Sequence, residues 1–250
     1  MINFFRHIRR QMTKENLPDP QAGKVSKYLL YAIGEIVLVV IGILIALQLN
    51  NWNAQHQAEK EELKLLQEMR HNLASDLEDC YWNIKKQAEL SYSNSAVLKH
   101  LKEGSSLTDS LRFHYGNLIY STTQRRNMSA YDHLKAKGID LIQNDSLRRN
   151  ITAIYSERYY YIERQELEYD NPYQMNEVIH HINAKLVLDD SSKTGYPINF
   201  ADLQKDDAFK GTLRMNVKVR EFMVKRYSSL SDDLENLIAH IDNEIAHSKP

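Results

Sequence analysis

One apolar run near the N-terminus constrains this chain more than any other feature. From Tyr28 to Leu49 the sequence is predominantly apolar, carries a single carboxylate at Glu35, and ends at an aromatic and amide collar around Trp52. A helix needs about 20 such residues to cross the hydrocarbon core of a bilayer. The run therefore predicts one transmembrane helix at residues 28–50, with the lipid bilayer as its first partner.

Lysine and arginine are distributed unequally about this run. Those before it are Arg6, Arg9, Arg10, Lys14, Lys24 and Lys27. Glu15 and Asp19 oppose them, and the next basic residue is Lys60, which lies among glutamates. Because cytoplasmic flanks carry the excess of Lys and Arg, we expect residues 1–27 in the cytoplasm and residues 51–250 outside it. A cleaved signal peptide is the alternative, but its apolar core is shorter and is followed by small residues.

The first twelve residues combine apolar and basic side chains. The apolar ones fall on one helical face, namely Phe4, Phe5, Ile8 and Met12. Two interpretations remain open: a helix that lies in the cytoplasmic headgroup layer, or a basic flank without fixed structure. Residues 17–23 follow with two prolines and a glycine, so we interpret them as a linker.

One face of the predicted span carries residues suited to helix association. Glu35, Gly42 and Ala46 share this face, and the last two form a small-xxx-small pair. Such a pair lets a neighbouring backbone approach closely. It therefore predicts a homo-oligomer with Glu35 facing the seam. In the alternative interpretation Glu35 snorkels toward the cytoplasmic end of the span, bonded to Tyr31.

Composition favours helices beyond the span. The chain has 250 residues with only 8 Gly and 5 Pro, and its 32 Lys and Arg nearly balance 33 Asp and Glu. Few helix breakers predict an all-α fold, and balanced charge argues against a nucleic-acid partner. The single cysteine, Cys80, excludes an intrachain disulfide and a cysteine-based zinc site, and we interpret it as a structural thiol.

An apolar stripe predicts that the exported region begins with a long helix. Residues 54–101 contain no Pro or Gly, and the near-heptad stripe is Leu63, Leu66, Leu73, Leu77, Cys80 and Ile84. We expect this helix to continue directly from the transmembrane helix. A second series of apolar residues predicts a helix at residues 202–246, which can lie antiparallel to the first in a coiled-coil-like periplasmic bundle.

Stop and cap signals predict shorter helices between these two. Gly104 ends the first helix, and Thr108 or Asp109 caps the next one. Gly138 suits the left-handed end of another helix. Asn144 or Asp145 then caps the helix that follows, and we interpret residues 130–154 as a helical hairpin rather than a DNA-binding motif. Residues 188–192 are expected to form a solvated loop.

Two stretches resemble a known family. Gly34-Glu35-Ile36 and the continuation from Gly42-Ile43-Leu44 to Asn51-Trp52-Asn53 resemble the anchor of a bacterial single-span membrane family of unknown function. The block from Tyr131 to Tyr155, with Gly138 inside it, resembles that family's second recurring stretch. The resemblance implies a Gram-negative inner-membrane setting, in which residues 51–250, expected outside the cytoplasm, would be periplasmic. It implies no activity and no cofactor.

One spacing is compatible with metal chemistry. Glu177 and His181 are one helical turn apart, with His180 beside them. The order is not that of the His-Glu-x-x-His zinc peptidases, and no third ligand is obvious. We therefore predict a surface helix with no metal site. A metal-dependent periplasmic hydrolase or transferase that uses these three residues is the alternative.

Aromatic and charged residues alternate from residue 155 to residue 169. Because consecutive tyrosines cover every side of a helix, some must face water or a partner. The residues assigned to a partner surface for an envelope protein are Arg158, Tyr159, Tyr160, Tyr161 and Arg164. Packing of the tyrosines against the long helices is the alternative. The sequence as a whole favours a non-enzymatic scaffold, accessory or sensing protein over an enzyme.

Overall fold

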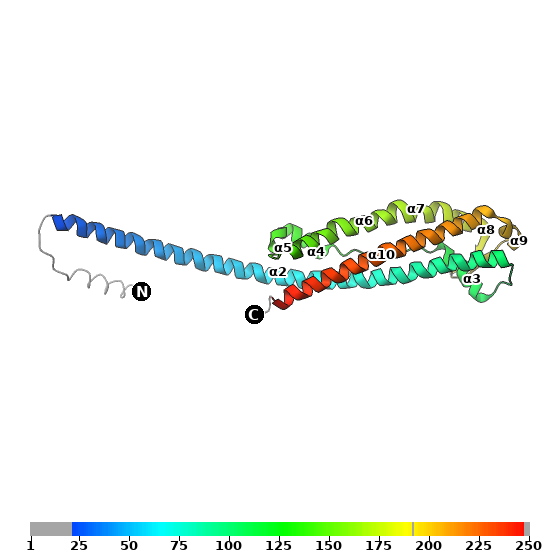
Figure 1. Cartoon of the computed structure of the whole chain (residues 1–250), viewed down its shortest axis with the longest axis horizontal. Coiled ribbons are helices and arrows are strands. Elements are labelled where there is room, and N and C mark those ends of the chain that lie inside the picture. The colour runs from blue at the N-terminus through cyan, green and yellow to red at the C-terminus, as the bar shows by residue number, and fades with distance from the viewer. Residues whose placement is uncertain (1–21, 192, 248–250) are drawn as a thin grey trace. The chain divides into compact units, whose positions relative to one another are not determined.

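The computed structural model of this chain describes residues 22–191 and 193–247. The first twelve residues, for which two interpretations were open, and most of the expected linker lie outside the described residues. Ala22 and Gly23, which were expected to end the linker, already belong to a helix. The chain divides into two compact units, residues 1–59 and residues 60–250. Each unit is described by itself below, with the element labels of Figure 1.

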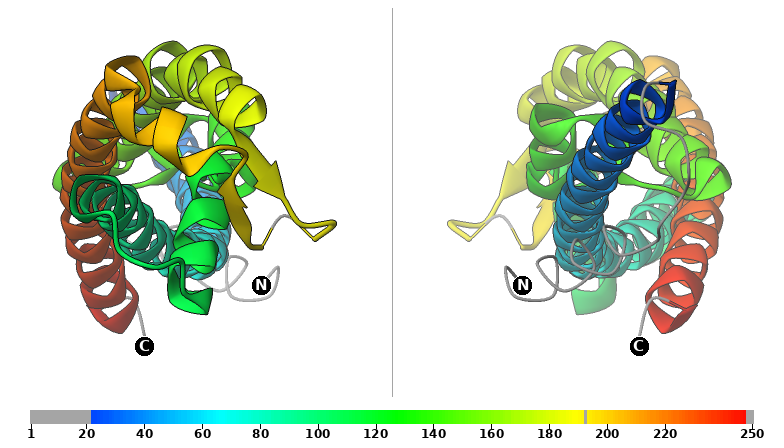
Figure 2. Two further views of the ribbon diagram at one scale, coloured as in Figure 1. Left: turned by 90° about the vertical axis from the view of Figure 1, so that its right-hand side faces the viewer. Right: turned by 90° about the vertical axis from the view of Figure 1, so that its left-hand side faces the viewer.

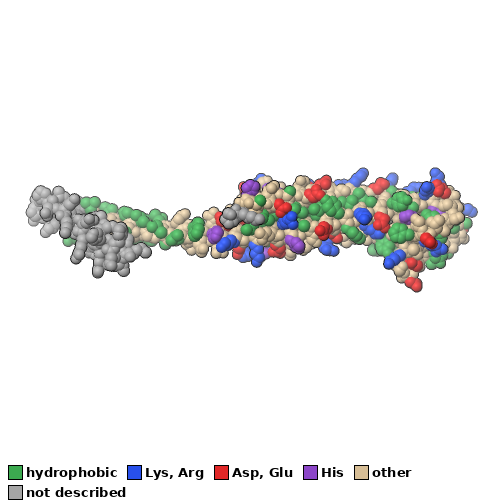
Figure 3. Space-filling view, turned by 90° about the horizontal axis from the view of Figure 1, so that it is seen from below, with side chains coloured by type: hydrophobic (Ala, Val, Ile, Leu, Met, Phe, Trp, Pro, Cys, Tyr) green, Lys and Arg blue, Asp and Glu red, His purple; other side chains and the backbone are tan. Residues whose placement is uncertain are grey.

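The first unit holds the N-terminal part of α2, an α-helix that runs from Ala22 to Glu103. The expectation that the apolar run continues without a break into the next predicted helix is therefore confirmed. In the described part of the chain this is the one helix long and apolar enough to cross a membrane, and none of its apolar window is buried. Hydrophobic side chains cover its surface in Figure 3. Trp52, at the end of the run, is 65% exposed and stacks on His56.

The second unit is a helical bundle, so the predicted all-α class is confirmed. Its longest partners are the C-terminal part of α2 and α10, Asp207–His247, which lie side by side and antiparallel (Figures 1 and 2). The Arg70–Asp242 ion pair and the hydrogen bond from Asn216 to Asn94 mark the two ends of this pairing. Leu66, Leu73 and Cys80 of the predicted stripe are buried, and its other three residues are half-buried. Cys80 donates its thiol hydrogen bond to the carbonyl oxygen of Tyr227.

A third helical run covers this pair and alternates between α-helix and π-helix. Its segments are α5 Asp145–Thr152, η3 Ala153–Arg158, α6 Tyr159–Arg164, η4 Gln165–Asp170, α7 Asn171–Tyr173, η5 Gln174–Val178 and α8 Ile179–Lys185. The three η segments named here are π-helical. Asn144 caps α5 by accepting from the amides of Ser146 and Leu147, which decides between the two caps expected there.

Short elements close the end of the bundle where α2 stops. They are α3 Asp109–Gly116, η1 Asn117–Ile119, the strands β1 Leu186–Leu188 and β2 Gly195–Pro197, and α9 Phe200–Lys205. Gly104 ends α2 with φ 65°, and Thr108 caps α3 through the amide of Leu111. A second hydrophobic core lies here, around Phe209 and Leu213.

One local expectation was wrong. The helix expected at residues 202–246 is divided at Asp206, whose carboxylate accepts from the amide of Phe209 and so caps α10. Of the solvated loop expected at residues 188–192, residues 189–191 are exposed and outside any strand, Leu188 ends β1, and residue 192 lies outside the described residues. The strands on either side form an antiparallel hairpin that was not expected, in which Val187 pairs with Tyr196. Each strand has only three residues, too few to show an alternating pattern in the sequence.

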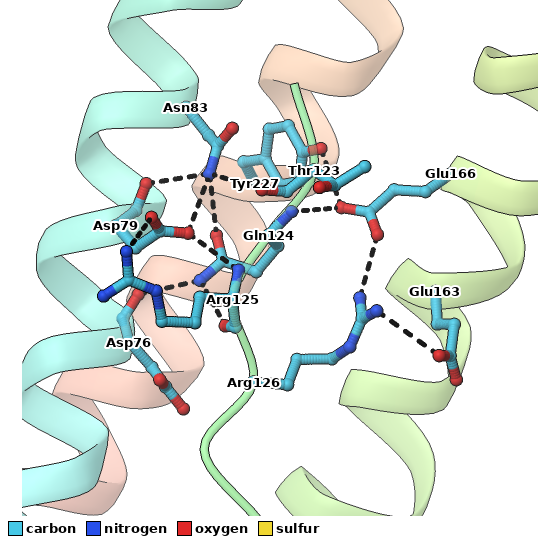
Figure 4. A network of polar contacts seen from close by, with 10 residues as sticks. All are labelled: Asp76, Asp79, Asn83, Thr123, Gln124, Arg125, Arg126, Glu163, Glu166 and Tyr227. Atoms are coloured by element: carbon cyan, nitrogen blue, oxygen red, sulfur yellow. Dashed lines mark hydrogen bonds and ion pairs between the residues drawn. The ribbon is translucent and has the colours of Figure 1, made fainter. Parts of the chain in front are cut away.

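Residues 120–128 connect η1 to α4, Ser129–Lys137, without forming a helix or strand. We call this segment the strap. It passes between α2, α10 and the π-containing run (Figure 4), and Thr122 and Gln124 on it are buried. After α4, η2 Ile139–Leu141 leads to α5, and Gly138 between them has φ 108°. The positive φ expected at Gly138 is present, although its ψ of 129° lies outside the left-handed helical region.

Candidate functional site

The best candidate for a functional site is a groove of about 610 Å³ beside the strap. The end of the strap, α4, η3 and α6 form it. The residues that line it are Arg126, Met128, Tyr131, Lys135, Tyr155, Ser156, Tyr159, Tyr160 and Glu163. Its volume suits a small ligand or the side chains of a docked protein.

Stacked tyrosines form the floor of this groove. The rings of Tyr131 and Tyr155 stack with centroids 4.7 Å apart, and Tyr159 meets Tyr155 edge-on at 5.3 Å. All three are buried. Tyr160 is different, because it is 55% exposed and contacts Arg164. The groove therefore has a buried aromatic floor and one exposed aromatic side chain at its rim.

The charged groups of the groove are already paired with one another. Arg126 donates to Glu166 at 2.8 Å and to Glu163 at 3.3 Å, while Lys135 lies 2.8 Å from Asp132. Cations neutralised in this way do not form a free anion site. The arrangement is better suited to holding the shape of the groove than to binding a phosphate or carboxylate.

Carboxylates hold the strap (Figure 4). The amide of Gln124 donates to Glu166 at 2.6 Å, that of Arg125 to Asp79 at 2.7 Å, and that of Asn127 to Asp76 at 2.9 Å. A buried extended segment must find partners for its amides. Here side chains of α2 and η4 provide them.

This polar layer continues along the bundle to a buried arginine. Arg220 of α10 is fully buried and donates to the side chain of Gln87 at 3.0 Å and to the carbonyl of Tyr120 at 2.6 Å. Its guanidinium lies 3.7 Å from Asp170. Burial lowers the pKa of Arg220, and the charge of Asp170 opposes that shift. The polar layer thus connects α2, α10 and η4 with one another and with the strap.

Several ionisable groups in this layer have shifted pKa values. Burial raises the pKa of Asp76 above its ordinary value, more than the hydrogen bonds from Tyr159 and Asn127 lower it. Burial and the charge of Asp76 also raise the pKa of Tyr159 far above its usual range. Burial raises the pKa of the Cys80 thiol to about 12, so it is a poor nucleophile at neutral pH.

The five residues assigned from the sequence to a partner surface occupy different environments. Tyr159 is buried and donates to Asp76, and Tyr161 lies under the guanidinium of Arg226. Arg158 pairs with Asp233 at 3.1 Å, which leaves Tyr160 with Arg164, whose guanidinium donates to the Tyr160 hydroxyl. Packing in the core thus accounts for Tyr159, whereas Tyr161 contacts α10 but stays 41% exposed. Tyr160 with Arg164 is the exposed pair that also borders the groove.

The three residues of the alternative metal site do not gather. Glu177 and His180 are exposed, His181 is half-buried, and the imidazole rings of the two histidines are 6.0 Å apart. Among residues 22–191 and 193–247, no three His, Cys, Asp or Glu side chains form a group able to hold a metal ion. Glu177 also lies in the π-helical η5, so the regular turn assumed between it and His181 is absent.

A serine–histidine contact that sequence reasoning missed lies near the far end of the bundle. Ser93 Oγ is 3.1 Å from His114 Nδ1 and accepts from the side chain of Asn117 at 3.1 Å. Ser93 is fully buried, however, so no substrate can reach its hydroxyl. The contact packs α3 against α2 rather than forming a nucleophile with its base.

In the first unit, Glu35, Gly42 and Ala46 are all exposed. A side chain added at Gly42 would meet no atom within 4 Å. The face expected to associate is therefore unoccupied by other described parts of this chain.

Fold and site together define the class of protein: an all-α protein with one candidate membrane span and a bundle built around a carboxylate-held strap. Residues 35–194 match the model of DUF6090, a family of unknown function, and the chain belongs to that family. The match includes much of the apolar run, the strap and the groove. No curated protein and no solved structure matches the chain.

Proposed function

We propose that this protein is a non-enzymatic, membrane-anchored scaffold, accessory or sensing protein of the bacterial inner membrane. In this proposal residues 28–50 span the bilayer, residues 1–27 remain in the cytoplasm, and residues 51–250 form a periplasmic helical domain. The observation that carries the proposal is the exposed apolar stretch of α2. A surface this apolar is stable in hydrocarbon and costly in water.

The ends of the stretch support a membrane location. Tyr28 is 76% exposed at one end and Trp52 is 65% exposed at the other. Along an α-helix these two residues are separated by about 36 Å, which exceeds the roughly 30 Å of a hydrocarbon core. Aromatic side chains favour the two interfaces of a bilayer, so both residues suit a boundary position.

The chemistry of the bundle supports a binding or structural role over catalysis. The charged residues of the groove pair with one another, the thiol of Cys80 is buried, and Ser93 is closed to solvent. The rim formed by Tyr160 and Arg164 is the surface we assign to an envelope partner. Tyr and Arg are frequent contact residues in protein interfaces.

Thiol labelling tests the topology. In a Cys80→Ala background, a cysteine replacing exposed Ser110 of α3 should react with a membrane-impermeant reagent once the outer membrane is opened. A cysteine replacing Thr13 is the matched control and should react only after the inner membrane is broken, because Lys and Arg flank that side. The reverse pattern would overturn the orientation, and labelling of both sites in intact spheroplasts would overturn the span.

A metal-dependent enzyme is the alternative function. The zinc content of the purified protein distinguishes it from the scaffold. We expect the purified untagged chain to hold far less than one equivalent of zinc, because Glu177, His180 and His181 do not converge. We also expect His181→Ala to leave the thermal unfolding temperature unchanged. Stoichiometric zinc that His181→Ala releases would replace the scaffold proposal with the enzyme.

A further inference from the structure

We propose that docking of the strap, residues 120–128, is coupled to uptake of one proton by Asp76. The proton comes from solvent and binds Oδ1 of the carboxylate, and no other bond forms or breaks. The strap is then held more firmly as the pH falls. Because Arg126 and Met128 of the strap also line the groove, the same proton would set the shape of the groove.

The geometry of Asp76 separates the roles of its two oxygens. Oδ2 accepts from the hydroxyl of Tyr159 at 2.6 Å and from the amide of Asn127 at 2.9 Å. Oδ1 is buried and has no hydrogen-bond partner among the described residues. A proton on Oδ1 therefore leaves both existing hydrogen bonds intact, while it removes a charge from a fully buried side chain.

The charged and titratable groups around Asp76 come from every element packed near it. They are Asp79 and Cys80 on α2, Arg125 on the strap, Tyr155 on η3, Tyr159 on α6, Glu166 on η4, and Tyr227 on α10, which donates to Glu166. Most of these are acids. Arg125, whose charge lowers the pKa of Asp76, is 68% exposed and lies 3.9 Å from Asp79. Arg126 of the strap pairs with Glu166.

The neighbouring carboxylates differ from Asp76 in their partners. Glu166 accepts from Arg126, from Tyr227 and from the amide of Gln124. Asp79 lies near Arg125 and accepts from Asn83. Each of these two carboxylates therefore has an arginine close to it. Asp76 has hydrogen bonds but no ion pair in the described chain, and its Oδ1 is left without a hydrogen-bond partner.

The direction of the coupling follows from the raised pKa of Asp76 in the docked state. When the strap leaves, water reaches the carboxylate, which returns to an ordinary value of about 3.9. Between the two values the docked state binds a proton that the undocked state does not. The equilibrium constant for docking then falls as the pH rises, by up to tenfold for each pH unit.

Hydrogen exchange on the full chain in detergent tests this coupling. The readout is the protection of the strap amides at Gln124, Arg125 and Asn127 between pH 4 and 8, corrected for the intrinsic exchange rate. We expect this protection to fall with rising pH, by up to tenfold per unit over part of the range. Amides in the centres of α2 and α10 should show no such loss.

Two substitutions make the test specific. Asp76→Asn keeps an oxygen that accepts from Tyr159 and Asn127 but cannot titrate, so the pH dependence should disappear. Asp242→Asn, which removes the exposed ion pair with Arg70, is the matched control and should keep the pH dependence of protection. Tyr159→Phe removes a hydrogen bond that lowers the pKa of Asp76, so the midpoint should move to higher pH.

Three results would overturn the proposal. They are a flat wild-type profile, a slope that persists in Asp76→Asn, and protection that rises with pH. If Asp76→Asn does not fold, two measurements still test the proposal: the pH profile of the wild-type protein, and the shift of its midpoint to higher pH in Tyr159→Phe. A merely structural role for Asp76 predicts no movement of that midpoint.

Discussion

The backbone amides of the strap, residues 120–128, donate to carboxylates where those of a strand would donate to a neighbouring strand. The carboxylates are those of Asp76, Asp79 and Glu166. Each accepts one amide hydrogen of an extended segment that has no strand beside it. Side-chain carboxylates make stronger hydrogen bonds than carbonyls, but each carries a charge into the interior. At the scale of single residues, the bundle is therefore held by polar contacts as well as by its apolar core.

Gly116 is a second residue on which local structure depends. A Cβ placed there would lie 2.4 Å from the carbonyl oxygen of Lys193, so the hairpin backbone would have to move. We expect Gly116→Ala to lower the free energy of unfolding by about 1–3 kcal/mol. Thermal and urea unfolding followed by circular dichroism measure the change.

Gly211 provides the matched control for this substitution. It lies within α10, and a Cβ there meets nothing within 4 Å. Gly211→Ala should therefore raise the free energy of unfolding by about 0.5–1 kcal/mol, since alanine favours a helix interior. Equal effects of the two substitutions would contradict the close contact at Gly116.

Some residue-scale features could be predicted from the sequence and others could not. Capping residues act through local geometry, so the helix stop at Gly104 and a cap at Thr108 or Asp109 were accessible from the pattern, and the structure decides for Thr108. The roles of Asp76 and Glu166 were not. The sequence around a buried polar residue on a helix looks the same as that around a solvated one. Asp76 and Glu166 are buried because the strap packs against them, and the strap lies about 40 residues or more away in the sequence from either residue.

At the scale of elements, the π-helical segments solve a problem of periodicity. The run buries a residue at every fourth position, namely Ile162, Glu166, Asp170, Gln174, Val178 and Ile182. In a regular α-helix each step of four residues turns the side chain about 40° past the previous one. Five such steps would carry it to the opposite face. Wider π-helical turns cancel this drift and keep the polar row against α10.

A pair of deletions tests this explanation. A π-helical segment holds more residues per turn than an α-helix, so removal of exposed Glu168 from η4 should leave the flanking residues near their positions. Removal of exposed Lys225 from the regular α10 should rotate every later residue by about 100°.

We expect the Glu168 deletion to unfold cooperatively with a loss of no more than about 2 kcal/mol, and the Lys225 deletion to lose its cooperative transition. Near-ultraviolet circular dichroism and thermal unfolding measure both. If the two deletions lower the stability equally, the π-helical segments do not act by accommodating an extra residue in the turn.

The same periodicity shows what sequence reasoning overlooked at this scale. A strict spacing of four from Ile162 to Ile182 was present in the sequence, but the usual helical patterns allow spacings of three and four together. The π-helical turns were therefore not expected. The break at Asp206 was missed for a related reason, because apolar residues continue on both sides of it and only its carboxylate cap marks the start of α10.

At the scale of the whole molecule, length and composition were enough for the fold class. Few glycines and prolines, one apolar run and two long apolar stripes led to one long helix that enters a bundle, as observed. The strap was not foreseen, because an extended segment buried by side-chain hydrogen bonds has no periodic signal. The groove depends on the strap and was equally inaccessible.

Self-association is the prediction that concerns the complete chain. Gly42→Ile should reduce the molar mass of the protein in mild detergent, because a bulky side chain keeps two backbones apart at the seam with Ala46. Val37→Ile, on a different face, adds one methylene and should leave the mass unchanged. Light scattering after size-exclusion chromatography measures both, and an unchanged mass for Gly42→Ile would remove this face from the interface.

The two tryptophans of the chain are both exposed, Trp52 by 65% at the end of the apolar run and Trp82 by 56% on α2 within the bundle. Neither indole contributes to the hydrophobic core, so their fluorescence reports surroundings rather than unfolding. In the proposed topology Trp52 lies at the lipid boundary and Trp82 in water. Quenchers attached to lipid chains would then reduce the fluorescence of Trp52, and dissolved ionic quenchers would reduce that of Trp82. The chain therefore carries one fluorescent reporter for the lipid boundary and one for water.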